Sequence, residues 1–516
     1  MKRSRVLPLA AAMILVAAGV FAAPTFSNYV AIGDSLTAGW QSGCLVARHQ
    51  LRSYPATLAA RFGMTVAGEG DSDPSPGKFQ QPLAGEPGIP QPCYSLTLSA
   101  AGVGIDFHAG EPGGQPENST LPRPYNNLGI PGSHSYDQVD KTTSSGADIY
   151  SLVLRNFPGS PLNGTSAVEQ AIALQPTFIT VWAGNNDDLD AVGSGTVISD
   201  SCLALNPAEN GLCDGITLTT IDKFTTKYTQ ILQTLHAALP NATIVVVTLP
   251  DVTSIPFATT VPAVVINPAT QQPVLDPSGH VIPLIGEKHD GTVAQVDPST
   301  TLVTLGALPL EAQGLGIPCA VAPNLPACDH PLPDGHLELD GLHPGVLLYG
   351  DEVAAVLARN AAYNAAITTA AASIGAPVFD INAIFHDIRA HGKTYGGVTL
   401  TTTFLTGGIF GYDGVHPNNV GYAIVADEMI KFLNSTYGTK LARVDVYGAM
   451  FQPDVPSSGD SLRPSSATSG ASLFPIEAWQ RLLDVFAPVH EAVRTVPLRE
   501  LFPGASRAGE KEKPRF

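Results

Sequence analysis

Basic charge, paired cysteine motifs and long apolar runs are all scarce in this sequence. Its 516 residues include 27 lysines and arginines against 45 aspartates and glutamates, giving a net charge of −18. No basic stretch is interleaved with aromatic residues, so a surface for nucleic-acid phosphates is not expected. Charged residues make up only 14% of the chain, whereas its 50 glycines and 44 prolines predict a loop-rich protein. Apolar residues, at 44%, are enough for a sizeable core.

The N-terminus carries the one apolar run that resembles a targeting signal. Three cations precede the apolar stretch 6–20, and "VFA" at 20–22 has the small-x-small pattern of a cleavage site. An uncleaved anchor is the alternative, but the run is short for a bilayer span. No later stretch is long and apolar enough to span a bilayer. We therefore expect a signal peptide over residues 1–22, an exported protein (periplasmic or secreted), and no membrane span after signal cleavage.

The cysteines lack the CxxC spacing of metal sites, so no metal is expected from them. The acidic run 185–190 also lacks the spacing of a calcium-binding EF-hand loop. Six cysteines suit an exported protein with disulfides. Short loops cost the least entropy to close, which favours three pairs: Cys202–Cys213, Cys319–Cys328 and the remaining Cys44–Cys93. Free structural thiols are the alternative.

Apolar runs alternate with helical patterns along the chain, which predicts βα units around a parallel sheet. Runs typical of strands buried on both faces lie at 29–32, 177–182, 243–249 and 377–381. Helical patterns lie at 53–62, 221–239, 351–375 and 421–434. The fold class is therefore α/β.

Two stretches rich in proline, glycine and serine interrupt this alternation, at about 64–124 and 252–338. Loops of such length inside a domain indicate functional insertions; small β elements within them are the alternative. We expect one domain over residues 23–440 that contains both insertions. Residues 441–516 are then a Pro/Ser-rich linker with a short helical or disordered tail.

The tetrapeptide GDSL occurs twice, and a nucleophilic serine could come from either copy. The first copy, at 33–36, follows a predicted buried strand and opens toward a helix. Ligands of open α/β sheets bind at the carboxyl ends of strands, where Ser35 would lie. The second copy, at 459–462, lies in the Pro/Ser linker, which cannot hold Ser461 in a fixed geometry. We therefore predict Ser35 as the nucleophile.

The motif DGxHP is also doubled, and each copy offers a histidine base with an aspartate three residues before it. Such an aspartate can accept from one imidazole nitrogen and leave the other for the serine proton. Asp413 and His416 come directly before the last predicted helix, whereas Asp340 and His343 end the long insertion. Position therefore favours Asp413 and His416, and an ordinary Asp-Gly turn is the interpretation of the other copy.

Two further segments could supply donors to an oxyanion. "YNNLGIPGSHS" at 125–135 has closely spaced glycines, and "WAGNND" at 182–187 presents amide side chains after a buried strand. Each segment alone is weak evidence, because an asparagine after a strand is most often a turn residue. His134, within the glycine loop, is interpreted as a surface histidine.

Four ordered blocks together resemble the SGNH/GDSL hydrolase family of esterases and lipases: "GDSLTAG" (33–39), "NLGIPG" (127–132), "GNND" (184–187) and "DGVHPN" (413–418). The resemblance implies a three-layer α/β/α, flavodoxin-like domain with a parallel sheet and no cofactor. It implies Ser35 as nucleophile, His416 as base and Asp413 as its orienting partner. The implied oxyanion hole comprises the amides of Ser35 and Gly132 and the side chain of Asn186.

The resemblance predicts an exported serine ester hydrolase acting on a small-molecule or lipid ester through an acyl-enzyme. The GxSxG elbow of α/β-hydrolases is absent from the sequence. Two alternatives use the same scaffold. One is a non-catalytic glycan- or surface-binding protein, although only 7% of residues are aromatic and could stack on sugars. The other is an acyltransferase that uses the same residues.

Overall fold

The computed structural model describes residues 23–451 except 100–101, 109, 146–147, 198–216, 289 and 339–340. The predicted signal peptide and Ser461 lie outside the described residues, as do Asp340, the pair Cys202–Cys213 and the tail beyond 451. Of the expected linker and tail, residues 441–451 are described, and they include a short helix, α16 (Val446–Met450), that packs on α15 (Asn419–Tyr437).

A five-stranded parallel sheet forms the middle layer, in the order β17-β8-β7-β1-β6. Its strands are β1 (Tyr29–Gly33), β6 (Asn127–Gly129), β7 (Phe178–Trp182), β8 (Thr243–Val247) and β17 (Val378–Phe379). Four of them coincide with the predicted apolar runs. The fifth, β6, lies in the glycine-containing segment 125–135. It is only three residues long, and so short a run shows no periodicity in the sequence.

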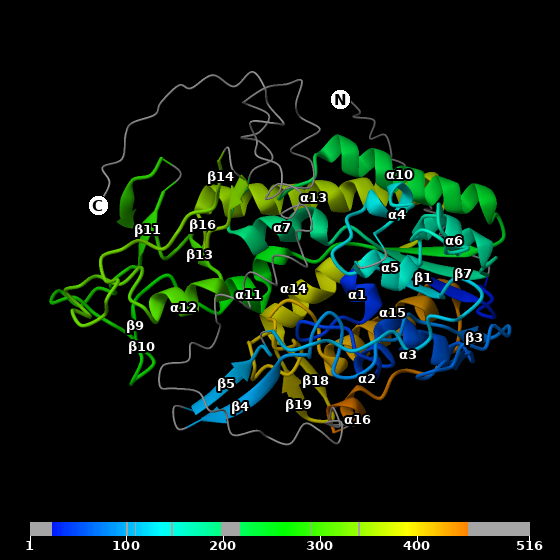
Figure 1. Ribbon diagram of the computed structural model, residues 1–516, viewed down its shortest axis with the longest axis horizontal. Helices are drawn as coiled ribbons and strands as arrows, with labels where there is room; N and C mark the ends of the chain where they lie inside the picture. Colours follow the sequence, from blue (N-terminus) through cyan, green and yellow to red (C-terminus); the bar gives the residue numbers. More distant parts are fainter. Residues whose placement is uncertain are drawn as a thin grey trace, which may run out of the picture.

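Helices cover both faces of the sheet, which confirms the three-layer α/β/α fold (Figure 1). One layer contains α10 (Ile221–Ala238) and α13 (Gly350–Ser373), and the other contains α3 (Tyr54–Arg61) and α15. These are the four predicted helices. The apolar stripe of α10 is buried in the core that also contains the strands. Strands buried on both faces explain the uninterrupted apolar runs.

Shorter elements complete the described chain. The remaining helices are α1 (Ser35–Ala38), α2 (Ala47–Gln50), α4 (Asp137–Asp140), α5 (Ile149–Leu154), α6 (Ala167–Ala173), α7 (Asn186–Ser194), α11 (Pro256–Thr259), α12 (Leu308–Glu311) and α14 (Ile381–His391). Helix α6 begins with a capping box between Ser166 and Glu169. Helix α14 follows β17 directly, so the run at 377–381 is half strand and half helix start.

The insertions contain small β elements rather than structureless loop. The first holds the pair β2 (Thr65–Val66) and β3 (Lys78–Phe79) and the hairpin β4 (Ser95–Ser99) with β5 (Gly102–Asp106). The second region holds β9 (Ile266–Asn267), β10 (Gln272–Pro273), β11 (Ile285–Glu287), β12 (Val293–Gln295), β13 (Leu302–Val303) and β14 (His336–Glu338). Strands β15 (Gly341–His343) and β16 (Leu347–Leu348) follow it, and β18 (Lys393–Tyr395) pairs with β19 (Val398–Leu400) later in the chain.

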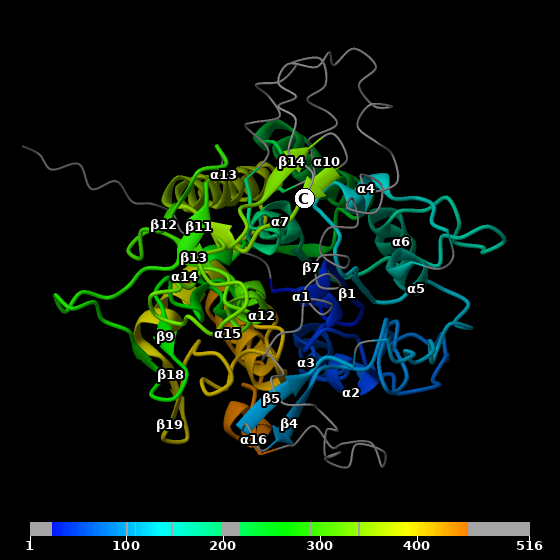
Figure 2. The same ribbon diagram turned by 60° about the vertical axis from the view of Figure 1, so that its left-hand side comes forward.

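The second insertion forms a lobe with its own apolar cluster. Figure 1 and Figure 2 show β9 and β11 at one end of the molecule, away from α6, and Figure 2 shows β12 beside β11. The cluster includes Phe257, Leu284, Leu305 and Leu347, and it extends to Val415 in the loop before α15. Strands of two to three residues are too short to show a periodic pattern, so the sequence does not predict the strands of this lobe.

Two disulfides tie loops of the described chain together, Cys44–Cys93 and Cys319–Cys328, as expected from the spacing of the cysteines. The first joins segments 49 residues apart, and the second closes a loop of the insertion lobe with a separation of nine residues. Within the part of the chain that is described, no helix combines the length and apolar character needed to cross a bilayer.

Candidate active site

Ser35 lies where the first strand of the sheet turns into a short helix. Strand β1 ends at Gly33, and Asp34 caps α1 by accepting a hydrogen bond from the Leu36 amide at 3.1 Å. A Cβ on Gly33 would overlap the carbonyl oxygen of Trp182 in the neighbouring strand, so this tight turn needs glycine. Ser35 is thereby held, 2% exposed, at the carboxyl end of β1.

His416 and Asp413 meet Ser35 from the loop before α15. The Nε2 atom of His416 is 2.9 Å from Ser35 Oγ, and its Nδ1 atom is 3.0 Å from Asp413 Oδ2. Asn418 caps α15 by accepting from the amides of Val420 and Gly421, which fixes the point where this loop ends. The structure therefore brings together the three residues for which the sequence predicts roles as nucleophile, base and orienting acid.

Asp413 is buried and fully supplied with hydrogen-bond donors. Its Oδ1 accepts from the amides of Val415 at 3.0 Å and His416 at 2.9 Å, and its Oδ2 accepts from the Gly43 amide at 3.1 Å. Burial by itself would raise the pKa of the Asp413 carboxyl, but the charge of His416 and the hydrogen bonds outweigh it and hold this pKa below its usual value. With Nδ1 of His416 on Asp413, the other ring nitrogen, Nε2, faces Ser35.

The amides of Ser35 and Gly132 both lie in backbone that leaves an N–H group available. Ser35 is the first residue of α1, where amides have no partner within the helix. Gly132 has a φ of 75° in the turn after β6, which is tied to the end of β1 by the Ile130 amide donating to Gly33 at 2.9 Å. Among the residues that the structure describes, no protein group accepts from either amide.

Asn186 begins α7 directly after β7, as the order of blocks predicted. Its side-chain amide donates to the Ser133 carbonyl at 2.8 Å, so the third predicted oxyanion donor lies against the glycine loop that contains Gly132. An asparagine amide has two N–H groups, and the Ser133 carbonyl accepts from one of them.

Two polar residues that the sequence interpretation missed connect these segments. Asp34 Oδ2 accepts from the Asn185 backbone amide at 3.1 Å and from its side-chain amide at 2.7 Å. Burial raises the pKa of Asp34 to about 6, against the opposing effect of these hydrogen bonds. Both residues were visible inside the GDSL and GNND blocks, but nothing local showed that they contact each other across 151 positions.

His134 is a buried residue, and its interpretation as a surface histidine was wrong. It is 2% exposed, with Nε2 2.9 Å from Asp190 Oδ2 and Nδ1 3.5 Å from Asp137 Oδ2. Next to it, Asp187 accepts from the Ser135 amide at 2.7 Å and from the Ser135 hydroxyl at 2.9 Å. Burial alone would lower the pKa of His134, but its hydrogen bonds to Asp137 and Asp190 outweigh this and raise the pKa well above its ordinary value.

We expect His134→Ala to lower the free energy of unfolding by about 3–5 kcal/mol, because it leaves Asp137 and Asp190 buried without their cation. Since folding raises the pKa of His134, its contribution is complete below pH 6.5, its ordinary pKa, and is lost as the pH rises through the folded-state pKa. We therefore expect the difference in the free energy of unfolding between wild type and variant, measured with urea, to decrease as the pH rises above 6.5.

A matched control for this prediction is His280→Ala. His280 also faces an aspartate, Asp276, at 3.5 Å, but its side chain is 80% exposed, so we expect no measurable change in stability. An equal effect of the two substitutions, or a difference for His134→Ala that widens with pH, would contradict the prediction.

Of the second copies of the two motifs, the structure describes His343 but neither Asp340 nor Ser461. His343 lies in β15, in a hairpin with β14, and its ring stacks on that of His336 with centroids 5.2 Å apart. Asp340 and Ser461 lie outside the described residues. The catalytic roles assigned to Ser35, Asp413 and His416 therefore stay predictions.

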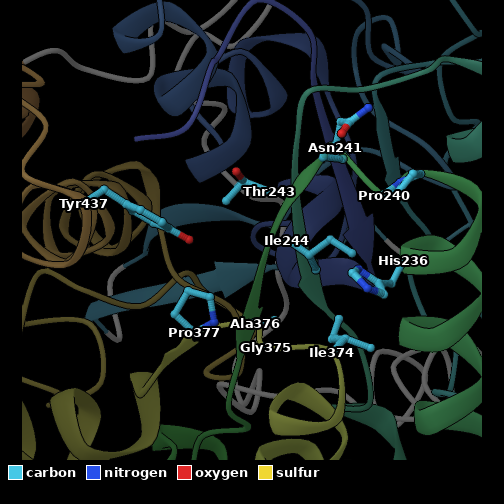
Figure 3. Close-up of a pocket in the computed structure, with 11 residues that line it drawn as sticks. His236, Pro240, Asn241, Thr243, Ile244, Ile374, Gly375, Ala376, Pro377 and Tyr437 are labelled. Atoms are coloured by element: carbon cyan, nitrogen blue, oxygen red, sulfur yellow. The ribbon is translucent and has the colours of Figure 1, made fainter. Parts of the chain in front are cut away.

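A pocket of about 230 Å³ lies at the opposite edge of the sheet, near the start of β8 and β17 (Figure 3). Its lining includes His236 in the last turn of α10, Thr243 at the start of β8 and Tyr437 at the end of α15. Because Ser35 lies at the carboxyl end of β1, this pocket is separate from the candidate active site.

The comparisons with known proteins agree with this geometry. The family model described as "GDSL-like Lipase/Acylhydrolase" matches residues 29–429, which contain both the sheet and all the candidate site residues. No match was found among the curated proteins or among the solved structures compared with the chain.

Proposed function

Since the chain belongs to the GDSL-like lipase/acylhydrolase family, we propose that it is an exported serine ester hydrolase. The observation that carries the proposal is the chain of hydrogen bonds from Ser35 Oγ to His416 Nε2, at 2.9 Å, and from His416 Nδ1 to Asp413 Oδ2, at 3.0 Å. A nucleophile within hydrogen-bond reach of a base that a third group orients is the signature of nucleophilic catalysis.

In the proposed mechanism, His416 Nε2 takes the proton of Ser35 Oγ as this oxygen attacks the ester carbonyl carbon. The negative charge that develops on the carbonyl oxygen is stabilised by the amides of Ser35 and Gly132 and by the second N–H of Asn186. The tetrahedral intermediate expels the alcohol, which receives the proton from His416. Water, deprotonated by His416, then attacks the acyl-Ser35 ester, and His416 returns this proton to Ser35 Oγ as the acyl–oxygen bond breaks and the acid is released.

The insertion lobe packs against the loop that carries the proposed base. The amide of Phe257 in the lobe donates to the Gly414 carbonyl at 2.8 Å, within the same loop as Asp413 and His416. A Cβ on Gly414 would approach Leu305 Cδ1 to 2.9 Å, so the lobe packs directly against this loop. We propose a small-molecule or lipid ester as the substrate.

Export is supported by the two disulfides, because such bonds persist in oxidising compartments. The predicted signal peptide at 1–22 has the same implication. We propose a periplasmic or secreted location, which fractionation of the producing cells into cytoplasm, periplasm and medium would test.

The function is tested with p-nitrophenyl esters from acetate to palmitate. We expect hydrolysis that depends on acyl length, and a fluorophosphonate probe that inactivates the enzyme and is found on Ser35 by mass spectrometry. An alcohol acceptor added to the assay distinguishes acyl transfer, which would give a new ester. No turnover of any ester, together with no labelling, would overturn the proposal and favour a binding protein.

A further inference from the structure

A two-residue turn, which precedes the first insertion in the sequence, lies against Asp413. Gln41 and Cys44 form a bridge, with hydrogen bonds of 3.1 and 3.3 Å between their backbones, and Ser42 and Gly43 between them have φ values of 52° and 79°. Two successive residues with positive φ are the mark of a type I′ hairpin turn. The turn points the Gly43 N–H at Asp413 Oδ2, at 3.1 Å, from 370 residues away in sequence.

We propose that the Gly43 amide, held in place by the Cys44–Cys93 disulfide, is the positioning group for Asp413 and through it for His416. The inference rests on the proposed function, because it assigns a role relative to that site. The same oxygen, Asp413 Oδ2, accepts from Gly43 and from His416 Nδ1. The Gly43 N–H therefore fixes the oxygen that faces the imidazole, whereas the donors from Val415 and His416 fix the other oxygen.

Several contacts hold the turn against the Asp413 loop. The amide of Tyr94 donates to the Ser42 carbonyl at 2.8 Å, and the amide of Tyr412 donates to Ser42 Oγ at 3.0 Å. A Cβ on Gly43 would overlap the ring of Tyr94, so only glycine combines the positive φ with this packing. Ser42 thus links the turn both to the residue after Cys93 and to the residue before Asp413.

The disulfide makes this arrangement covalent. Cys44 directly follows Gly43, Cys93 directly precedes Tyr94, and the two cysteines are 0% and 6% exposed. Next to them, Leu45 and Ile89 exchange backbone hydrogen bonds of 2.9 and 2.8 Å. Without the disulfide these segments remain neighbours, but the turn gains freedom to move. A shift of about 1 Å at a catalytic group costs on the order of 100-fold in rate.

The first test compares two disulfide variants, Cys44→Ala/Cys93→Ala and the control Cys319→Ala/Cys328→Ala. The control removes a bond that closes a loop of the insertion lobe, in which the Cys319 amide donates to Asp329 Oδ1 at 2.8 Å. On the best p-nitrophenyl ester, we expect kcat to fall about 10- to 100-fold in the first variant with KM unchanged. The control should stay within about twofold of wild type.

Proton NMR supplies a readout that a general loss of stability does not move. The His416 Nδ1 proton, shared with Asp413, should give a low-field resonance in wild type and in the control variant. In Cys44→Ala/Cys93→Ala at a temperature where the protein is folded, we expect that resonance to broaden or move upfield. Equal kcat values for the two disulfide variants, with the resonance unchanged, would overturn the inference.

A glycine pair keeps the inference testable where the disulfide variant does not fold. Gly43→Ala is compared with Gly396→Ala, which has a φ of 55° in another two-residue turn and whose Cβ would likewise overlap a tyrosine ring, that of Tyr447. Both strain the backbone, but only the first displaces a donor of Asp413. We expect kcat to fall at least tenfold for Gly43→Ala alone.

Adding Tyr94→Ala to Gly43→Ala removes the overlapping ring and should recover part of the lost kcat. Equal kcat values for Gly43→Ala and Gly396→Ala would overturn the inference. Failure of the proposed function gives a different result, because a serine ester hydrolase requires that Ser35→Ala is inactive whatever these variants do. An inactive Ser35→Ala with an unaffected Gly43→Ala rejects only the positioning role.

Discussion

We expect replacement of Ser35 by alanine to lower kcat on the best p-nitrophenyl ester by about 10⁵- to 10⁶-fold, the scale of losing a serine nucleophile that works with a histidine. The reason is that Ser35 Oγ is the oxygen within 2.9 Å of His416 Nε2, so its removal leaves the base without the atom it activates. The substitution deletes one buried oxygen and retains the backbone amide of the oxyanion hole. We therefore expect KM and the melting temperature to change little.

Ser461→Ala is the matched control, because it alters the same tetrapeptide in the second GDSL copy. We expect its kcat and KM to equal those of wild type within about twofold. Initial rates with ester concentrations on both sides of KM, together with burst titration of acyl-enzyme, measure the two effects. Full activity in Ser35→Ala would reject the mechanism, and loss of activity in Ser461→Ala would place the nucleophile in the tail.

The central sheet was predictable because its strands are buried on both faces. Runs such as 178–182 and 243–247 have no polar face that would blur them, and their continuous apolar character is visible without any partner. Ser35 followed from the same reasoning, since a residue after such a strand is delivered to the carboxyl edge of the sheet. The segments on either side of each GDSL copy, rather than the motif itself, showed which copy could hold the nucleophile.

Contacts between distant segments were not predictable from local patterns. The pairing of Asp34 with Asn185 joins residues that follow the ends of the neighbouring strands β1 and β7, and it becomes visible only when the strand order is known. His134 is buried in contact with Asp137 of its own segment and with Asp190 of α7, and these hydrogen bonds raise its pKa, whereas its own sequence resembles an exposed loop. In the sequence, Gly43 likewise belongs to an ordinary Ser-Gly turn, and only the structure shows that its amide contacts Asp413.

The candidate site is therefore held together by backbone groups as well as by side chains. Asp413 receives its hydrogen bonds from its own loop and from Gly43, and Asn186 lies against the carbonyl of Ser133. Backbone groups are present at every residue and have no sequence signature, so a motif search recovers the side chains of such a site and misses what orients them. Preorganised donors of this kind are nevertheless a large part of the catalytic effect in serine hydrolases.

We expect His416→Ala to lower kcat by about 10⁵- to 10⁶-fold, because the proposed mechanism has the histidine and the serine act as a unit. We expect Asp413→Asn to lower kcat on the order of 10⁴-fold, since an amide Nδ2 facing His416 Nδ1 favours the wrong tautomer. The matched pair in the other DGxHP copy, His343→Ala and Asp340→Asn, should change neither kcat nor KM by more than about twofold.

These four variants separate the two copies because they change the same residue types in the same motif. His343 stacks on His336 in a hairpin, whereas His416 has one ring nitrogen on Ser35 and the other on Asp413. An active His416→Ala beside an inactive His343→Ala would reverse the assignment of the base. The expected order, with His416 costing more than Asp413, follows from their roles: one residue transfers the proton, and the other orients the residue that does.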